Sequence, residues 1–262
     1  MLTFADWLTL REPADAAARS TQLADLVGER LAGLTRATVH DLGTGTGSMG
    51  RWLAPRIAVP QHWIMYDRDD DLLARAKAGM TAGSAETRNT DITRLTPEDL
   101  RDADLITASA LLDMFTAEEV ERVADTCAGV RVPVYFALSV TGDVHLTPTA
   151  PLDAEVGVAF NAHQRRTVHG APLLGPDAPK STINAFIDRG ARVLQRSSPW
   201  ILGSDQAELV AEWFAGWIGA ACEQRPELAQ PVEEYARRRL AETTSGRLRV
   251  TVGHVDLLAI WD

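Results

Sequence analysis

Residues 39–55, VHDLGTGTGSMGRWLAP, carry three glycines at alternate positions, Gly43, Gly45 and Gly47, directly after a short apolar run. A structural turn between a strand and a helix needs one or two glycines. Because glycine has no Cβ, three of them indicate that a ligand lies close against the main chain. SMGRWLA predicts a helix that stops before Pro55. The stretch therefore predicts a strand, a turn and a helix, with a ligand at the carboxyl end of the strand.

The same alternation of strands and helices continues through the first half of the chain. Further strands are predicted at HWIMYD, SAETRNTDI, ADLITAS and RVPVYFALSV, with helices between them. Strands connected in this way form a parallel sheet that helices cover on both faces. The unbroken apolar run VYFAL fits a strand buried on both sides. We therefore predict an α/β fold with a three-layer, doubly wound sheet.

The flanking segments are predicted from periodicity and from breaker residues. Leucine spacing predicts one N-terminal helix over 13–34 that opens at Pro13. Residues 141–179 are rich in Pro, Gly and His, which predicts a loop with one short helix. Later segments predict a helix over 181–190, a strand over 191–202, two helices within 204–245 and a closing strand over 247–261.

Composition limits the class of protein. The 262 residues carry a net charge of −10, which argues against a surface for nucleic-acid phosphates. Cys127 and Cys222 form no disulfide framework or metal-site spacing. The N-terminus does not resemble a secretory signal, and no apolar run is as long as a membrane span. We expect a cytoplasmic protein without nucleic-acid or membrane partners; a homodimer is compatible with the sequence.

An acidic residue follows the second predicted strand. Asp67 stands 24 positions after Gly43, where a carboxylate can accept hydrogen bonds from both hydroxyls of a ribose. The pattern indicates a cofactor that contains adenosine. Gly45-x-Gly47-x-x-Gly50 also satisfies the dinucleotide pattern, so an NAD(P)-dependent oxidoreductase stays open on spacing alone.

From residue 41 onward the chain resembles the class I S-adenosylmethionine-dependent methyltransferases. DLGTGTG is similar to the first motif of that family, and NTDI with Asp91, DLITASALLD and the long final strand extend the resemblance. It implies a mostly parallel seven-stranded sheet with an antiparallel last strand and helical insertions. It also implies S-adenosylmethionine as cofactor, S-adenosylhomocysteine as product, and no metal. The implied cofactor residues are Asp41, Gly43, Thr44, Gly45, Gly47, Asp67, Arg68, Asp91, Ile92, Ser109 and Ala110, with Arg19 reaching the methionine carboxylate.

The residues for the methyl acceptor are predicted from position. His163 lies past the fifth strand, where the acceptor must arrive, and could act as a general base; Asp113 is the alternative base. Arg166 could hold an anionic group, and Trp200 could line the acceptor site. A solvated polar helix explains residues 163–169 equally well.

The sequence predicts an enzyme that methylates oxygen or nitrogen of a small molecule. The Asn/Asp-Pro-Pro-Tyr signature of methyltransferases for bases or glutamine is absent after the fourth strand. A non-catalytic regulatory protein that binds S-adenosylmethionine is a further alternative. We expect one domain over 1–262, with a helical cap at 1–36, a cofactor-binding half at 37–140, and acceptor-covering insertions at 141–179 and 204–245.

Overall fold

The structure, a computed structural model, describes residues 2–261. One sheet joins strands from both halves of the chain. Its strands are β1 (Ala37–Leu42), β2 (Gln61–Asp67), β3 (Ser84–Asn89), β4 (Leu105–Ser109), β5 (Val134–Thr147), β8 (Arg192–Ser197), β9 (Trp200–Leu202) and β10 (Arg249–Ile260).

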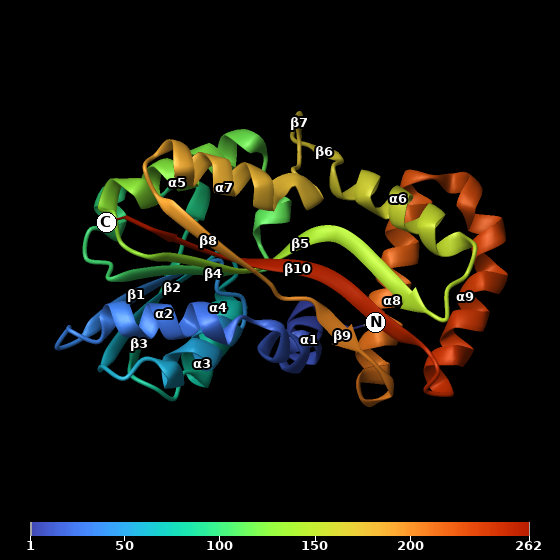
Figure 1. The fold of residues 1–262 in the computed structure, drawn as a ribbon, viewed down its shortest axis with the longest axis horizontal. Helices are drawn as coiled ribbons and strands as arrows, with labels where there is room; N and C mark the ends of the chain where they lie inside the picture. The colour runs from blue at the N-terminus through green and yellow to red at the C-terminus, as the bar shows by residue number, and fades with distance from the viewer. Residues whose placement is uncertain (1, 262) are drawn as a thin grey trace.

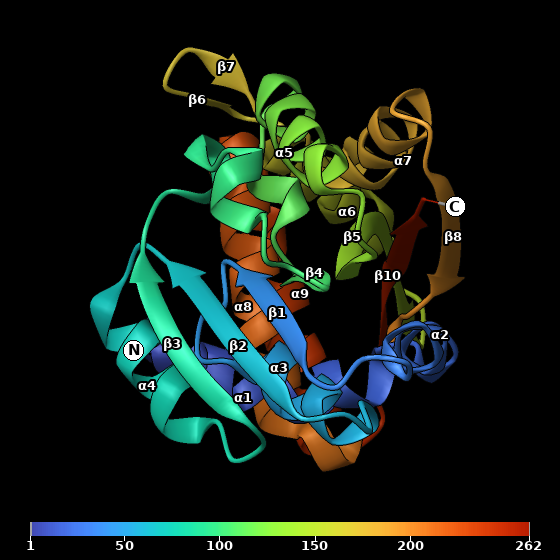
Figure 2. The ribbon, with the colours of Figure 1, turned by 90° about the vertical axis from the view of Figure 1, so that its left-hand side faces the viewer.

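The sheet runs in the order β3-β2-β1-β4-β5-β10-β8, and β9 also pairs with β10. β1 to β5 are parallel to one another, whereas β10 is antiparallel to β5, β8 and β9. Figure 2 shows the parallel strands side by side with their shared twist. The predicted mostly parallel sheet with an antiparallel last strand is confirmed.

Helices cover both faces of the sheet. α2, α3 and α4 lie on one face and α5 and α7 on the other (Figure 1). The helices are α1 (Phe4–Ala18), α2 (Thr21–Leu31), α3 (Ser48–Leu53), α4 (Asp70–Gly79), α5 (Ala117–Val130), α6 (Leu152–Gln164), α7 (Ala178–Asp188), α8 (Ala207–Gln224) and α9 (Ala229–Thr244).

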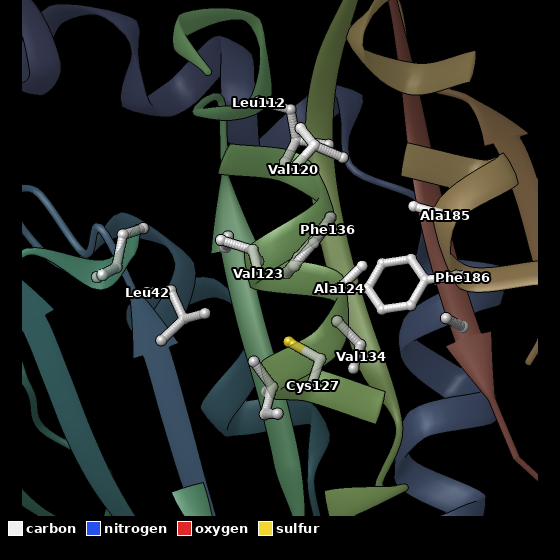
Figure 3. Close-up of a cluster of buried hydrophobic side chains, with 14 of the residues drawn as sticks. Leu42, Leu112, Val120, Val123, Ala124, Cys127, Val134, Phe136, Ala185 and Phe186 are labelled. Atoms are coloured by element: carbon white, nitrogen blue, oxygen red, sulfur yellow. The ribbon is translucent and has the colours of Figure 1, made fainter. Parts of the chain in front are cut away.

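Two apolar cores fill the space between the sheet and its helices. Along β2, Ile64 points to the core under α5 and α7, while Trp63 and Met65 point to the opposite core. Figure 3 shows the first core, where Phe136 of β5 and Phe186 of α7 meet the apolar side chains of α5. Burial on both faces explains why these strands read as unbroken apolar runs.

A third core lies beyond the sheet. The far halves of β5 and β10 extend past their neighbours and pack against α6, α8 and α9 (Figure 1). The prediction of loop was wrong for residues 141–147, because β5 continues to Thr147; the short helix expected within 141–179 is α6, which has 13 residues. Antiparallel pairing with β10 holds residues 144–147 in the sheet. The sequence around residues 144–147 does not reveal this pairing, because β10 lies far away in the chain.

The N-terminus also differs from its prediction. α1 begins at a capping box between Thr3 and Asp6, and Pro13 lies inside the helix rather than at its start. The predicted single helix is broken at Arg19, and Ser20 caps α2. The predicted strand over 191–202 is divided into β8 and β9. Within residues 2–261 we find no helix with the length and apolarity needed to span a membrane.

Candidate functional site

A cavity of about 720 Å³ lies at the carboxyl ends of β1, β2 and β4. Its floor is the glycine turn after β1. Its walls are formed by α1, by residues 109–122 and by the hairpin of β6 (Thr167–Val168) and β7 (Ala171–Pro172). This is the edge where ligands of open α/β sheets bind, and the volume lies in the range of small-molecule sites, about 300–1,000 Å³.

The glycine turn has a backbone that side chains rarely adopt. Gly43, Gly45 and Gly47 have φ angles of +65°, +54° and +85°. A Cβ on Gly43 would lie 2.8 Å from a methyl carbon of Leu111, and one on Gly45 would lie 3.1 Å from Leu8. Gly43 and Gly45 line the cavity, whereas Gly47 caps α3. The turn therefore requires glycine and leaves its backbone open to the cavity.

Asp41 is buried beneath this turn. Its carboxylate accepts hydrogen bonds from the hydroxyls of Thr44 at 2.6 Å and Thr107 at 2.7 Å. Burial raises the pKa of Asp41 to about 6, against the effect of those two hydrogen bonds. Asp41 and Thr44 line the cavity, so the carboxylate is placed to meet a cationic group.

Asp67 connects the end of β2 to the glycine turn. One carboxylate oxygen accepts the backbone N–H of Gly45 at 2.9 Å, and the other accepts those of Arg68 and Asp69. Asp67 and Arg68 both line the cavity. The carboxylate thus holds the turn and faces the space where a ribose is predicted.

Arg19 lies behind the cavity wall with 3% of its surface exposed. Its guanidinium donates to the hydroxyls of Ser48 and Ser109, both of which line the cavity. Its Nε is buried without a hydrogen-bond partner among the described residues. Burial lowers the pKa of Arg19, although Asp15 acts in the opposite direction. A buried guanidinium with an unused donor fits an anionic ligand group such as a carboxylate.

Asp91 and Ile92, two of the cofactor residues that the resemblance implies, differ in their position relative to the cavity. Ile92 lines the cavity, but Asp91 does not. Asp91 is 2.6 Å from Arg68 and accepts the Thr93 hydroxyl and backbone N–H. Burial opposes ionisation, but these partners lower the pKa of Asp91 to about 2. Ser109 and Ala110 line the cavity.

Only one of the residues predicted for the acceptor reaches the cavity. Asp113 lines it, and burial raises the pKa of its carboxyl. His163, Arg166 and Trp200 are not among the lining residues. His163 Nε2 is 3.0 Å from Glu223, and Trp200 is buried. α6 ends at Gln164, so Arg166 lies outside the helix that carries His163.

Two parts of the wall were not predicted residue by residue. α1 contributes Phe4, Trp7, Leu8, Arg11 and Asp15, and the hairpin contributes His169 at its tip with its apolar neighbours. The Thr3-x-x-Asp6 capping pattern could have indicated the start of α1 at residue 4. None of the lining residues comes from 204–245, the second segment predicted to cover the acceptor. Within residues 2–261 no cluster of His, Cys, Asp or Glu has an arrangement suited to a metal ion.

The strand order, the glycine turn and the acid at the end of β2 define a Rossmann-like protein that binds an adenosine-containing cofactor. Residues 39–133 match the family model described as a methyltransferase domain. The chain thus contains a class I S-adenosylmethionine-dependent methyltransferase domain, with S-adenosylmethionine as its cofactor. No curated protein matches the sequence.

Several solved structures are similar to the chain in fold. The YcgJ protein of Bacillus subtilis has a TM-score of 0.50 at 12% identity, over 93% of this chain and 100% of that one. A putative methyltransferase of Bacillus halodurans has 0.49 at 14%, over 90% and 96%. A methyltransferase of Geobacter sulfurreducens, in complex with S-adenosylhomocysteine, has 0.45 at 16%, over the full length of both chains.

Proposed function

We propose that this protein transfers the methyl group of S-adenosylmethionine to an oxygen or nitrogen atom of a small molecule. The observation that carries the proposal is the position of Asp113. This carboxylate lines the same cavity as the glycine turn, and neither a hydrogen bond nor an ion pair joins it to another side chain in residues 2–261.

The cofactor is assigned to the side of the cavity near β1 and β2. Asp41 would hold its ammonium group and Asp67 its ribose hydroxyls. Arg19 is not itself a lining residue, and it would act on the carboxylate from behind Ser48 and Ser109, through the unused Nε. Ile92 would pack against the adenine, while Asp91 would act by fixing Arg68. When bound, the cofactor supplies a methyl group on a sulfonium.

The remaining side of the cavity is assigned to the acceptor. Asp113 would accept a hydrogen bond from its O–H or N–H and take the proton as the methyl group is transferred. α1 would exclude water from this space and hold the acceptor in line. Positioning of this kind supplies a large share of the rate in a displacement between two bound groups.

We also propose that residues 1–262 form a single domain, with a helical cap at 1–36 and a cofactor-binding half at 37–140. This division is consistent with the cores described above. Of the two acceptor-covering insertions, the hairpin within 141–179 lines the cavity. His163 as base, and Arg166 and Trp200 as acceptor residues, have no contact with the cavity to support them.

The proposal is tested in two steps with the full chain. Calorimetry measures binding of S-adenosylhomocysteine, and fluorescence measures binding of NADH as the competing cofactor. Transfer from S-adenosylmethionine labelled in its methyl group is then measured across amines, alcohols and phenols. We expect binding of S-adenosylhomocysteine and a labelled product. NADH binding without S-adenosylhomocysteine binding would contradict the proposal.

A further inference from the structure

The arginines that line the cavity are each paired with a carboxylate. A bound group of negative charge would therefore find no free guanidinium on the described walls. The pairs are Arg11–Asp15, Arg68–Asp91 and Arg122–Glu118, with N–O distances of 3.0, 2.6 and 2.7 Å.

The lining acids are also occupied, with one exception. Asp41 accepts two threonine hydroxyls, Asp67 accepts backbone N–H groups, and Glu119 closes the capping box with Thr116. Within residues 2–261, no other residue forms a hydrogen bond or an ion pair with Asp113. Burial raises the pKa of its carboxyl, whereas a hydrogen bond from its own backbone and the charges of Arg11 and Arg166 act in the opposite direction. Asp113 is thus the lining acid whose carboxyl is available to a cationic group of a ligand.

Apolar side chains line much of the same cavity. They include Trp7 and Leu8 of α1, together with Leu111, Phe115 and Leu173. At the rim, Phe4 and Met114 also line the cavity although 64% and 57% of their surfaces are exposed. Apolar side chains with such exposure at a cavity mouth favour an apolar ligand.

We infer that the methyl acceptor is an amphipathic amine, a primary or secondary amino group on an apolar body, bound to the carboxylate of Asp113. The inference rests on the proposed function and specifies its acceptor. A cationic amine compensates the lone charge of Asp113, and its apolar body covers Trp7 and Leu111. An alcohol would leave that charge uncompensated, and a carboxylate would add a second one.

The chemical step follows from this pairing. The protonated amine first gives one proton to Asp113, which frees its lone pair. That lone pair forms the new C–N bond as the S–C bond breaks, and the electron pair of the broken bond stays on sulfur. The product is a methylated ammonium ion and a neutral thioether, and the proton on Asp113 passes to solvent. Charges and atoms balance without a further reactant.

The test uses matched ligands in the presence of saturating S-adenosylhomocysteine, so that binding is measured without turnover. The probes are 2-phenylethylamine, 2-phenylethanol and 3-phenylpropanoate, followed by the corresponding hexyl and indolyl sets. We expect each amine to bind about 10- to 150-fold more tightly than its alcohol, as for a hydrogen bond to a charged group. We expect the carboxylates to bind most weakly.

Asp113→Asn keeps the shape of the side chain and removes its charge. We expect it to abolish the preference for amines while the affinities for alcohols and for S-adenosylhomocysteine stay unchanged. Asp188→Asn is the matched control, because Asp188 is an exposed aspartate outside the cavity lining. It should retain the full preference.

The outcomes separate the inference from the proposed function. If S-adenosylhomocysteine does not bind, the proposed function itself fails. If it binds, but no amine binds or alcohols and carboxylates bind as well as amines, only the inferred acceptor class is overturned. An amine preference that survives in Asp113→Asn would overturn the role of Asp113.

Discussion

Asp41→Asn should stabilise the ligand-free protein at neutral pH. Burial raises the pKa of Asp41 from 3.8 to about 6. Between these two pH values the folded chain holds a proton that the unfolded chain has released. Stability from this group is therefore greatest at low pH and is lost as the pH rises through 6. At about 1.36 kcal/mol per pH unit, the ionised carboxylate costs the fold about 3 kcal/mol above pH 6.

Thermal unfolding of the ligand-free chain measures this cost. For a chain of this size about 3 kcal/mol corresponds to an increase in Tm of roughly 6–12 °C, which we expect for Asp41→Asn at pH 7.5. The increase should fall to about one third of this value at pH 4.5, and it should vanish below pH 3.8, where Asp41 is protonated in both the folded and the unfolded chain. The same variant should bind S-adenosylhomocysteine about 10- to 150-fold more weakly, because it loses a charged hydrogen bond to the ammonium group.

Asp41→Ala is the control for hydrogen bonding. It removes the acceptor for the hydroxyls of Thr44 and Thr107 and should be less stable than Asp41→Asn. The reasoning would be refuted if Asp41→Asn unfolded at or below the wild-type temperature at pH 7.5. Such a result would mean that the fold itself depends on the ionised carboxylate.

Three further predictions concern the glycine turn, the buried arginine and a buried histidine. Gly43→Ala should weaken S-adenosylhomocysteine binding and destabilise the fold more than Gly190→Ala, because both glycines have positive φ but only Gly43 has a close neighbour. Equal losses of stability in the two variants would mean that backbone strain alone, and not the contact with Leu111, explains the effect. Arg19→Met should weaken binding of S-adenosylhomocysteine but not of 5′-methylthioadenosine, which lacks the carboxylate; calorimetry that found both weakened would contradict this role. Burial lowers the pKa of His254 to about 4, so stability should fall by up to about 3 kcal/mol from pH 6.5 to 4, and His254→Gln should remove this dependence in urea titrations.

Much of the cofactor half could be predicted because its signals are local. The apolar runs of β1, β2 and β5 follow directly from burial between two helical layers. Thr116-x-x-Glu119 is a pattern typical of a helix start, and the structure has this capping box at the start of α5. The glycine turn was recognised because its conformation excludes side chains, which constrains the sequence at each position.

The acceptor side could not be predicted in the same way. Asp113 is the exception. It lies in the short turn soon after β4, so only a few residues determine its position at the sheet edge. His163 lies on α6, and the direction of its side chain depends on how α6 packs against α8. Pro13 was read as a helix start, although α1 continues through it.

The sequence by itself determined the sheet, the glycine turn and the residues suited to an adenosyl cofactor, because periodicity and backbone conformation act over a few neighbouring residues. Only the tertiary structure decided which side chains surround the acceptor. Pairing of β5 with β10, and the position of α1 over the strand ends, join residues that are far apart in the chain. The tertiary structure also placed His163 beside Glu223 rather than at the cavity.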